Sequence, residues 1–312
     1  MNNKIFRYII YFVLIICFFL LFFGGPNYYS SRSYKRIWDL GHIFYFAILS
    51  YVLLRRWMWI SKKKPMYQFL IIISFLLLIG FTVEVIQQKF SRLMEIGDLW
   101  RDLLGILFGI FFFSKRGLLI RPILLYCIKL AILIGILMEF ISPVVAILDE
   151  RIARNQFPIL SNFETPFEYD RWEVDGKIRK TDMLCFEGNH CLSVSLIPKK
   201  YSGLTLKYFP RDWHNYEYFQ FSIFNPSHNV LRLGCRIHDL IHVSLGEPYH
   251  DRFNKKLKLI PGWNTINILL SEIENAPRDR KIQLSSISNF RIFVADLDSI
   301  LDLYIDDVNL VQ

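Results

Sequence analysis

The chain has 312 residues, of which 53% are apolar, and its mean hydropathy of +0.29 is too high for a soluble protein of this size. Its formal charge of +9 could indicate nucleic-acid binding. The basic residues of the first half, however, crowd the ends of apolar segments, a pattern typical of membrane topology. We therefore expect membrane lipid as a partner and no nucleic acid. The long apolar runs end near residue 148, and a soluble domain is predicted after it.

Five apolar segments of the first half suit transmembrane helices, which need about 20 residues each. They cover residues 5–24, 39–59, 66–88, 97–114 and 119–148. The first lacks a small-x-small cleavage site and is too long for a signal peptide, so we interpret it as a retained anchor. If the segments alternate in direction, three basic clusters fall on one side: Lys4 and Arg7; Arg55, Arg56, Lys62, Lys63 and Lys64; Lys115, Arg116 and Arg121. This predicts a multi-pass inner- or plasma-membrane protein with a cytoplasmic N-terminus.

The second half has the pattern of an all-β domain. Short runs of β-forming residues alternate with turn signals, as in a sandwich or jelly roll. The runs are CLSVSLI, GLTLKYF, YEYFQFSIF, VLRLGCRI, KLKLI, WNTINILL, NFRIFVA and LYIDDVNLV. The predicted fold class is a membrane all-α region of about five transmembrane helices followed by an all-β extracytoplasmic jelly-roll sandwich. The expected divisions are 1–118 (four-helix transmembrane domain), 119–148 (fifth helix), 149–160 (linker) and 161–312 (sandwich).

Polar residues gather at one membrane face of the predicted spans, where unpaired charges are costly. The second, third and fourth spans and the loop after the third supply Asp39, His42, Glu84, Gln87, Arg92, Asp98 and Asp102. Glu95, Asp98 and Asp102 lie on one helical stripe, and Gly105 and Gly109 are spaced for close approach of a neighbouring helix. One interpretation is a hydrated ion-pair network that includes Arg92 and Arg101. The other is a functional site in which Glu84, Asp98 and Asp102, with His42 as base, are catalytic candidates.

These residues also carry a family resemblance. Glu84-x-x-Gln87, Arg92, Asp98, Gly105 and Gly109, preceded by Asp39 and His42, resemble the pattern of the VanZ-like membrane proteins over residues 1 to about 114. The chain departs from that pattern at Leu40, where the family commonly has Lys, and at Asp102, where it has Asn. The resemblance implies a link to glycopeptide or envelope-stress resistance and no defined biochemistry.

The second half offers candidate ligand residues in two closely spaced polar loops. They are Arg236, His238, Asp239, His242, Tyr249, Asp251, Arg252 and Asn254, with Trp213, Tyr216 and Tyr218 as stacking platforms. The alternative is that Asp and Asn build turns and that Arg252 pairs with Asp239 or Asp251. The closing strand, Tyr304, Ile305, Asp306, Val308 and Leu310, resembles that of galactose-binding-like jelly rolls found in carbohydrate-binding modules, over about residues 160–312. That resemblance implies a glycan or cell-envelope polymer as partner.

Cofactor and redox predictions for the second half are few. No metal-ligand spacing stands out, and no cofactor is expected except a structural Ca²⁺ held by carboxylates and carbonyls. Cys185 and Cys191 flank a predicted hairpin turn, where they either form a disulfide or pack as small apolar side chains.

The first function hypothesis is a non-enzymatic envelope protein that binds glycan at the outer face of the membrane. It is favoured because the chain has no nucleophile motif, P-loop, dinucleotide fingerprint or zinc motif. The rival is a membrane-embedded enzyme acting on a lipid-linked envelope precursor through Glu84, Asp98 and His42. A small transporter is a third hypothesis.

Overall fold

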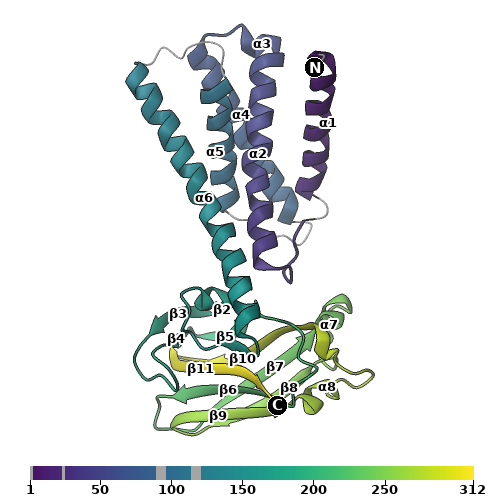
Figure 1. Cartoon of the computed structure of the whole chain (residues 1–312), viewed down its shortest axis with the longest axis vertical. Coiled ribbons are helices and arrows are strands. Elements are labelled where there is room, and N and C mark those ends of the chain that lie inside the picture. The colour runs from purple at the N-terminus through teal and green to yellow at the C-terminus, as the bar shows by residue number, and fades with distance from the viewer. Residues whose placement is uncertain (1–2, 23–24, 89–95, 114–120) are drawn as a thin grey trace. The chain divides into compact units, whose positions relative to one another are not determined.

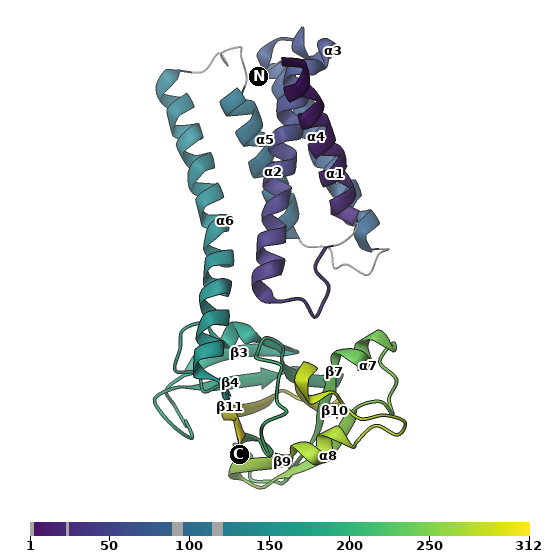
Figure 2. The ribbon, with the colours of Figure 1, turned by 45° about the vertical axis from the view of Figure 1, so that its right-hand side comes forward.

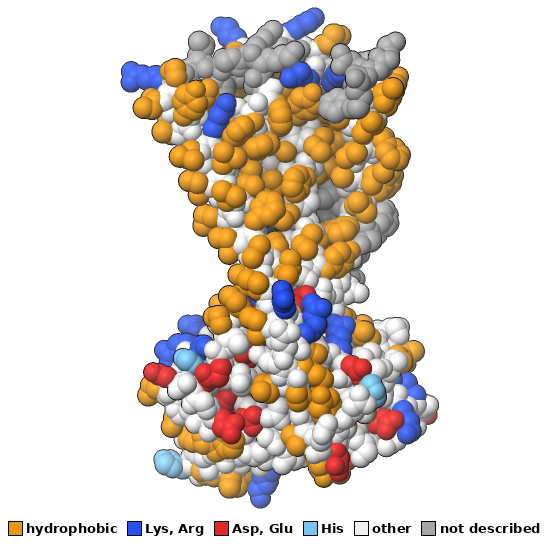
Figure 3. Space-filling model, viewed as in Figure 1, with side chains coloured by type: hydrophobic (Ala, Val, Ile, Leu, Met, Phe, Trp, Pro, Cys, Tyr) orange, Lys and Arg blue, Asp and Glu red, His pale blue; other side chains and the backbone are white. Residues whose placement is uncertain are grey.

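The computed structural model describes residues 3–22, 25–88, 96–113 and 121–312. The chain divides into two compact units, Met1–Ala146 and Ile147–Gln312. Figures 1 and 2 show helices throughout the first unit and mainly strands in the second. In Figure 3, hydrophobic side chains cover most of the visible helical surface, whereas charged side chains are scattered over the strand unit.

All regular elements among the described residues of the first unit are helices. Its elements are α1 (Asn3–Phe22), α2 (Arg32–Arg56), α3 (Met58–Ser61), α4 (Pro65–Gln88), α5 (Ile96–Phe113) and α6 (Pro122–Gln156), the last of which continues past the unit boundary. Each predicted span corresponds to one long helix. By length and composition, three helical segments in the described part of the chain suffice to cross a membrane: Arg32–Arg56, Pro65–Val83 and Pro122–Gln156. The structure therefore agrees with membrane association, while five spans and their orientation stay predictions.

Helices α2 and α5 pack with their backbones in close contact. A Cβ added to Gly105 would lie 2.4 Å from the carbonyl oxygen of Ile43, and one added to Gly109 would lie 1.8 Å from Oγ of Ser50. Only glycine leaves room for this approach, as expected for small residues between membrane helices. The prediction that Gly105 and Gly109 permit a close helix neighbour is confirmed, and this packing aligns the polar ends of α2 and α5.

The second unit is an antiparallel β-sandwich, which confirms the predicted β architecture. One sheet has the order β3-β4-β11-β6-β9, with β1 also paired to β11, and the other has the order β2-β5-β10-β7-β8. The strands are β1 (Ile159–Ser161), β2 (Trp172–Val174), β3 (Gly176–Thr181), β4 (Cys191–Leu196), β5 (Lys199–Leu206), β6 (Tyr218–Asn225), β7 (Leu231–Asp239), β8 (Phe253–Leu259), β9 (Gly262–Leu269), β10 (Ile287–Leu297) and β11 (Leu301–Val311). Short helices α7 (Leu240–Ser244), α8 (Leu270–Glu274), η1 (Glu168–Arg171) and η2 (Leu284–Ser286) connect them.

Alternation along the strands produces the core of the sandwich. In β8, for example, Phe253, Leu257 and Leu259 are buried, whereas Asn254, Lys256 and Lys258 are exposed. The inward side chains of both sheets form one apolar cluster that includes Trp213 and Phe290, each fully buried. This core lies wholly within the second unit, which is the expected condition for a domain that folds by itself.

A buried ion pair joins the C-terminal end of α6 to the start of the sandwich. Nε and Nη2 of Arg171 donate to Oδ1 of Asp149 at 2.9 and 2.7 Å, and Nη1 donates to the carbonyl oxygen of Leu160 at 2.8 Å. Arg171 is 0% and Asp149 2% exposed. Residues 149–156, predicted as part of a linker, form the end of helix α6. They include Asp149, whose carboxylate pairs with Arg171 inside the β unit.

Candidate functional site

His42 occupies the centre of a polar cluster in the helical unit. Its Nδ1 lies 2.8 Å from Oδ1 of Asp102, and its Nε2 lies 3.8 Å from Oδ2 of Asp98. His42 and Asp102 are 4% and 1% exposed. An imidazole between two carboxylates can accept a proton on one nitrogen while the other is hydrogen-bonded, so the geometry suits acid–base chemistry.

Arg101 neutralises the other carboxylates of this cluster. Its Nη1 donates to Oδ1 of Asp98 at 2.6 Å, and its Nε donates to Oε2 of Glu139 at 2.9 Å. Oδ2 of Asp39 lies 3.9 Å from the Arg101 guanidinium and 3.5 Å from that of Arg36. Because Arg101 is 8% exposed, this pairing offsets the cost of holding several carboxylates away from water.

The structure brings together four of the seven polar residues predicted for this region: Asp39, His42, Asp98 and Asp102. The side chains of Glu84 and Gln87, like Arg92 and Glu95, lie outside the described residues. Asp102 has one buried oxygen, Oδ2, without a hydrogen-bond partner among the described atoms. A Cβ on Gly80 would lie 2.3 Å from that oxygen, so glycine there makes room for the carboxylate.

In the β unit, four of the predicted loop residues lie in or beside a partly buried ion-pair cluster around Arg280. The cluster consists of Arg280, Asp239 and Asp251, with His242 and His238 beside it, and we call it the Arg280 cluster. The Arg280 guanidinium donates to both oxygens of Asp239 at 2.6 and 2.8 Å and to both oxygens of Asp251 at 2.5 and 2.6 Å. His242 donates its backbone N–H to Asp239, and its Nδ1 lies 3.1 Å from Asp251. His238 is fully buried, with its ring 4.5 Å from that of His242.

The pKa shifts in the Arg280 cluster follow from its contacts. Burial alone would raise the pKa of Asp239, but hydrogen bonds from Arg280 and from the backbone N–H groups of Gln283 and His242 outweigh it and lower that pKa. Hydrogen bonds from Arg280 likewise hold the pKa of Asp251 below its usual value. Burial lowers the pKa of His238 to about 4. The Asp239 carboxylate is therefore held in its charged form, and its oxygens already accept hydrogen bonds from Arg280, Gln283 and His242.

The remaining predicted ligand residues lie nearer the surface. Tyr249 is 63% exposed and stacks under the Arg252 guanidinium at 5.1 Å, and Nε of Arg252 donates to Oδ1 of Asn254 at 3.2 Å. Arg252 thus forms none of the ion pairs with Asp239 or Asp251 that the alternative interpretation proposed, since Arg280 takes that place. Trp213 cannot be a stacking platform, because it is fully buried against Phe219.

A second polar surface, not predicted from the sequence, covers the outer face of the β2-β5-β10-β7-β8 sheet. Phe293 of β10 lies opposite Gly203 of β5 and Gly234 of β7. A Cβ on Gly234 would meet three ring atoms of Phe293 at 2.5–2.9 Å, so the half-buried ring lies over that glycine. Tyr201, 54% exposed, meets the ring edge-on with centroids 6.2 Å apart.

Hydrogen-bonding side chains surround this aromatic pair. Arg291, two residues before Phe293, donates to Asp175 at 2.6 Å and to Thr205 at 3.3 Å. The register places Arg236 opposite both Arg291 and Asn254, so two predicted ligand residues, Arg236 and Asn254, belong to this face. We call the outer side chains of these five strands, centred on Phe293, the aromatic face.

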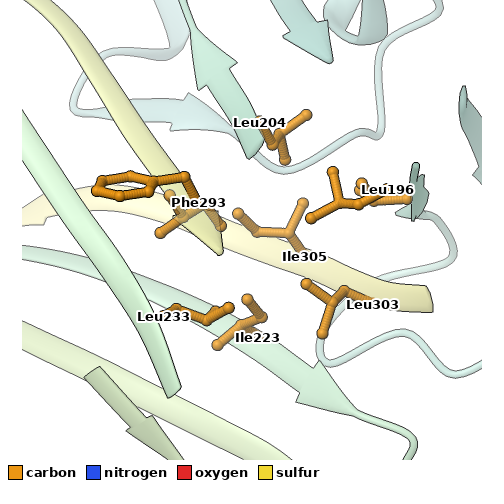
Figure 4. Close-up of a pocket in the computed structure, with 9 residues that line it drawn as sticks. Leu196, Leu204, Ile223, Leu233, Phe293, Leu303 and Ile305 are labelled. Atoms are coloured by element: carbon orange, nitrogen blue, oxygen red, sulfur yellow. The ribbon is translucent and has the colours of Figure 1, made fainter. Parts of the chain in front are cut away.

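The space between the two sheets offers no alternative site. The gap shown in Figure 4 is lined by nine apolar residues, including Leu204, Ile223 and Ile305, and the ring of Phe293 points away from it. Among the described residues, no group of three or more His, Cys, Asp or Glu side chains is placed to hold a metal ion.

Comparison with known proteins gives matches in structure alone. No family model matches the chain, and no curated protein matches it, so the VanZ-like resemblance stays an expectation. A family 11 carbohydrate-binding module from Clostridium thermocellum, solved with a β-1,3-1,4-mixed-linked tetrasaccharide, aligns with 49% of this chain and 94% of its own at 15% identity and a TM-score of 0.37. An exo-β-agarase aligns with 49% of this chain and 24% of its own (13% identity, TM-score 0.39). A non-crystalline-cellulose-specific module, CBM28, aligns with 50% and 94% (13% identity, TM-score 0.34).

Sequence reasoning missed Glu139 and the aromatic face. Glu139, a partner of Arg101, is a single acidic residue in the long apolar run of α6, and that isolation was the signal that could have identified it. The aromatic face has no such signal, because Tyr201, Phe293 and Gly234 become neighbours only through strand register.

Proposed function

We propose that the chain is a membrane-associated envelope protein whose C-terminal β-sandwich binds glycan on the aromatic face. The observation that carries the proposal is the arrangement of Phe293 and Tyr201 on an exposed sheet, with Arg236, Arg291 and Asn254 around them. Sugar rings stack on aromatic side chains through their apolar faces, while neighbouring polar groups bind the hydroxyls. The two glycines beside Phe293 keep the ring low on the sheet, which leaves a shallow surface for an extended chain.

A glycan array probed with the full-length protein in detergent tests this function. We expect the wild type to bind a subset of polysaccharides and Phe293→Ala to lose that binding about threefold to tenfold, since an aromatic stacking contact contributes about 0.5–1.5 kcal/mol. Tyr169→Ala is the matched control, because Tyr169 is an exposed aromatic residue, at 43%, in η1 rather than on the face. Equal loss in both variants, or no binding by the wild type, would contradict the proposal.

A second candidate function belongs to the helical unit. The buried His42–Asp102 pair, next to an Asp98 held by Arg101, favours acid–base chemistry on a lipid-linked envelope precursor. On this hypothesis, Asp98→Asn abolishes the phenotype that the full protein confers and leaves its level in the membrane unchanged. Arg36→Gln is the control, because Arg36 is a partly exposed partner of Asp39. If Asp98→Asn removes the protein from the membrane, the charge serves folding instead.

The expected topology completes the proposal. The cation bias across the predicted loops favours an extracytoplasmic β unit, where it would meet cell-envelope polymers. A C-terminal alkaline phosphatase fusion should be active if this is right, and an inactive phosphatase with a bright C-terminal fluorescent protein would contradict it.

A further inference from the structure

The charges on the aromatic face are distributed unevenly across its five strands. The carboxylates Asp175 and Glu173 lie at the β2–β5 side. There, Lys199 and Arg291 both donate to Asp175, at 2.7 and 2.6 Å, and Lys207 lies 3.6 Å from Glu173. The cations of that side are thus neutralised within the protein.

The β7–β8 side has the opposite character. Arg232, Lys256 and Lys258 point outward and are exposed. The register pairs Arg232 with Lys258 and Gly234 with Lys256. Directly opposed side chains lie about 5 Å apart, and neighbours two residues along a strand lie about 7 Å apart. The three cations therefore form a compact cluster, which we call the basic strip.

Within the part of the chain that the structure describes, no carboxylate forms an ion pair with Arg232, Lys256 or Lys258. Like charges held on neighbouring positions of two paired strands repel one another. Lysine on an edge strand also prevents edge-to-edge pairing of sheets. That role accounts for Lys256 and Lys258 on the edge strand β8. It does not account for Arg232 on β7, one strand further in.

The basic strip adjoins the aromatic platform. Gly234, over which the Phe293 ring lies, is two residues from Arg232 and opposite Lys256. A polymer chain stacked on Phe293 and extended toward β8 would place its next units over the three cations. An anionic group on those units would relieve the repulsion among Arg232, Lys256 and Lys258.

We infer that the ligand of the aromatic face is an anionic glycan, in which sugar rings stack on Phe293 and carboxylate, sulfate or phosphate groups bind Arg232, Lys256 and Lys258. This inference rests on the proposed glycan-binding function and names its substrate class. Anion recognition comes from the basic strip, and sugar recognition comes from the aromatic pair.

The test uses the full-length protein in nanodiscs of phosphatidylcholine, whose neutral surface does not compete for the probes. Three anionic glycans are measured at about 50 mM salt: oligogalacturonate for carboxylate, dextran sulfate for sulfate, and phosphorylated dextran for phosphate. The methyl ester of the same oligogalacturonate and unmodified dextran are the matched neutral probes. We expect at least one anionic polymer to bind tenfold or more tightly than a neutral probe, with affinity that falls as salt rises.

The decisive variant is the triple Arg232→Gln/Lys256→Gln/Lys258→Gln. It should lower the affinity for the anionic polymer about 10- to 100-fold and flatten its salt dependence. The control triple, Lys177→Gln/Arg179→Gln/Lys281→Gln, removes the same charge from exposed positions outside the aromatic face and should leave affinity within about twofold.

Other outcomes separate this inference from the function on which it rests. If charged and neutral probes bind equally and only Phe293→Ala weakens binding, glycan binding stands and the anionic ligand is overturned. If anionic polymers bind the triple variant as well as the wild type, the inference is overturned as well. If the triple variant only self-associates in size-exclusion chromatography, with binding by its monomer unchanged, the basic strip is merely edge protection. If no probe binds the wild type, both proposals fail.

Discussion

The change Arg280→Met keeps a long side chain and removes the guanidinium that joins Asp239 to Asp251. Asp239 is fully buried and would keep its backbone donors, the N–H groups of His242 and Gln283, but no cation. Leaving one partner of a buried pair uncompensated costs about 3–5 kcal/mol. Asp251 is 14% exposed and adds less, because water reaches it. For a unit the size of Ile147–Gln312, this loss lowers the melting temperature by about 10 °C.

Thermal unfolding of residues 147–312, followed by far-UV circular dichroism, measures this loss. Lys281→Met is the matched control, since Lys281 is 66% exposed and its contact with Glu274 is a surface pair that should change stability by less than about 0.5 kcal/mol. The double change Arg280→Met/Asp239→Asn should recover part of the stability, because no uncompensated charge remains at position 239.

The pH dependence provides an independent check of the same pair. Because the pKa of Asp239 is lowered in the folded protein, its stabilisation is present above the unfolded pKa near 4 and is lost as the pH falls through the folded value. Arg280→Met should remove most of that acid-dependent loss. A melting-temperature change below about 2 °C, with an unaltered acid profile, would refute the reasoning and reopen Asp239 as a ligand residue.

Three further results are expected. Gly105→Ala should destabilise the helical unit by about 1–3 kcal/mol, because the added Cβ would lie 2.4 Å from a backbone oxygen. Gly41→Ala is the control, since its Cβ would meet nothing within 4 Å and should not change the stability. Thermal aggregation in detergent measures both variants, and equal effects would contradict the packing argument. Burial lowers the pKa of His238 to about 4, so the β unit should lose about 3 kcal/mol as the pH falls from 6.5 to 4, and denaturant unfolding of His238→Gln should show a much smaller loss. Because the Sγ atoms of Cys185 and Cys191 lie 2.7 Å apart, air oxidation should join them, which a mass decrease of about 2 Da in the intact protein would reveal; an unchanged mass would show two free thiols, of which only Cys191 is buried.

Alternating or β-rich runs made eight strands of the sandwich, β4 to β11, predictable. The missed strands, β1, β2 and β3, are short or polar: β3 reads GKIRKT, and its exposed positions alternate only weakly with half-buried ones. Such a strand forms because β4 offers it a partner, and that information lies outside its own residues.

The polar cluster of the helical unit was predictable in part because helix periodicity and alternating span direction together bring polar residues to one face. Asp39, His42, Asp98 and Asp102 obey that rule. Which cation holds which acid depends on side-chain packing, so the pairing of Arg101 with Glu139 could not be derived from spacing. The Arg280 cluster could not be derived from spacing either, since Arg280 and its partner Asp239 lie 41 residues apart.

The pairing of Asp149 with Arg171 bears on whether the β unit could be shed by proteolysis. A cut anywhere between these residues leaves Arg171, fully buried, on the released fragment without its carboxylate. The released domain would start with a deficit of about 3–5 kcal/mol, a large fraction of the stability of a typical domain. A protease that severs the chain at residues 150–170 would therefore release a destabilised sandwich, which should unfold at a lower temperature than residues 147–312 with the helix end attached.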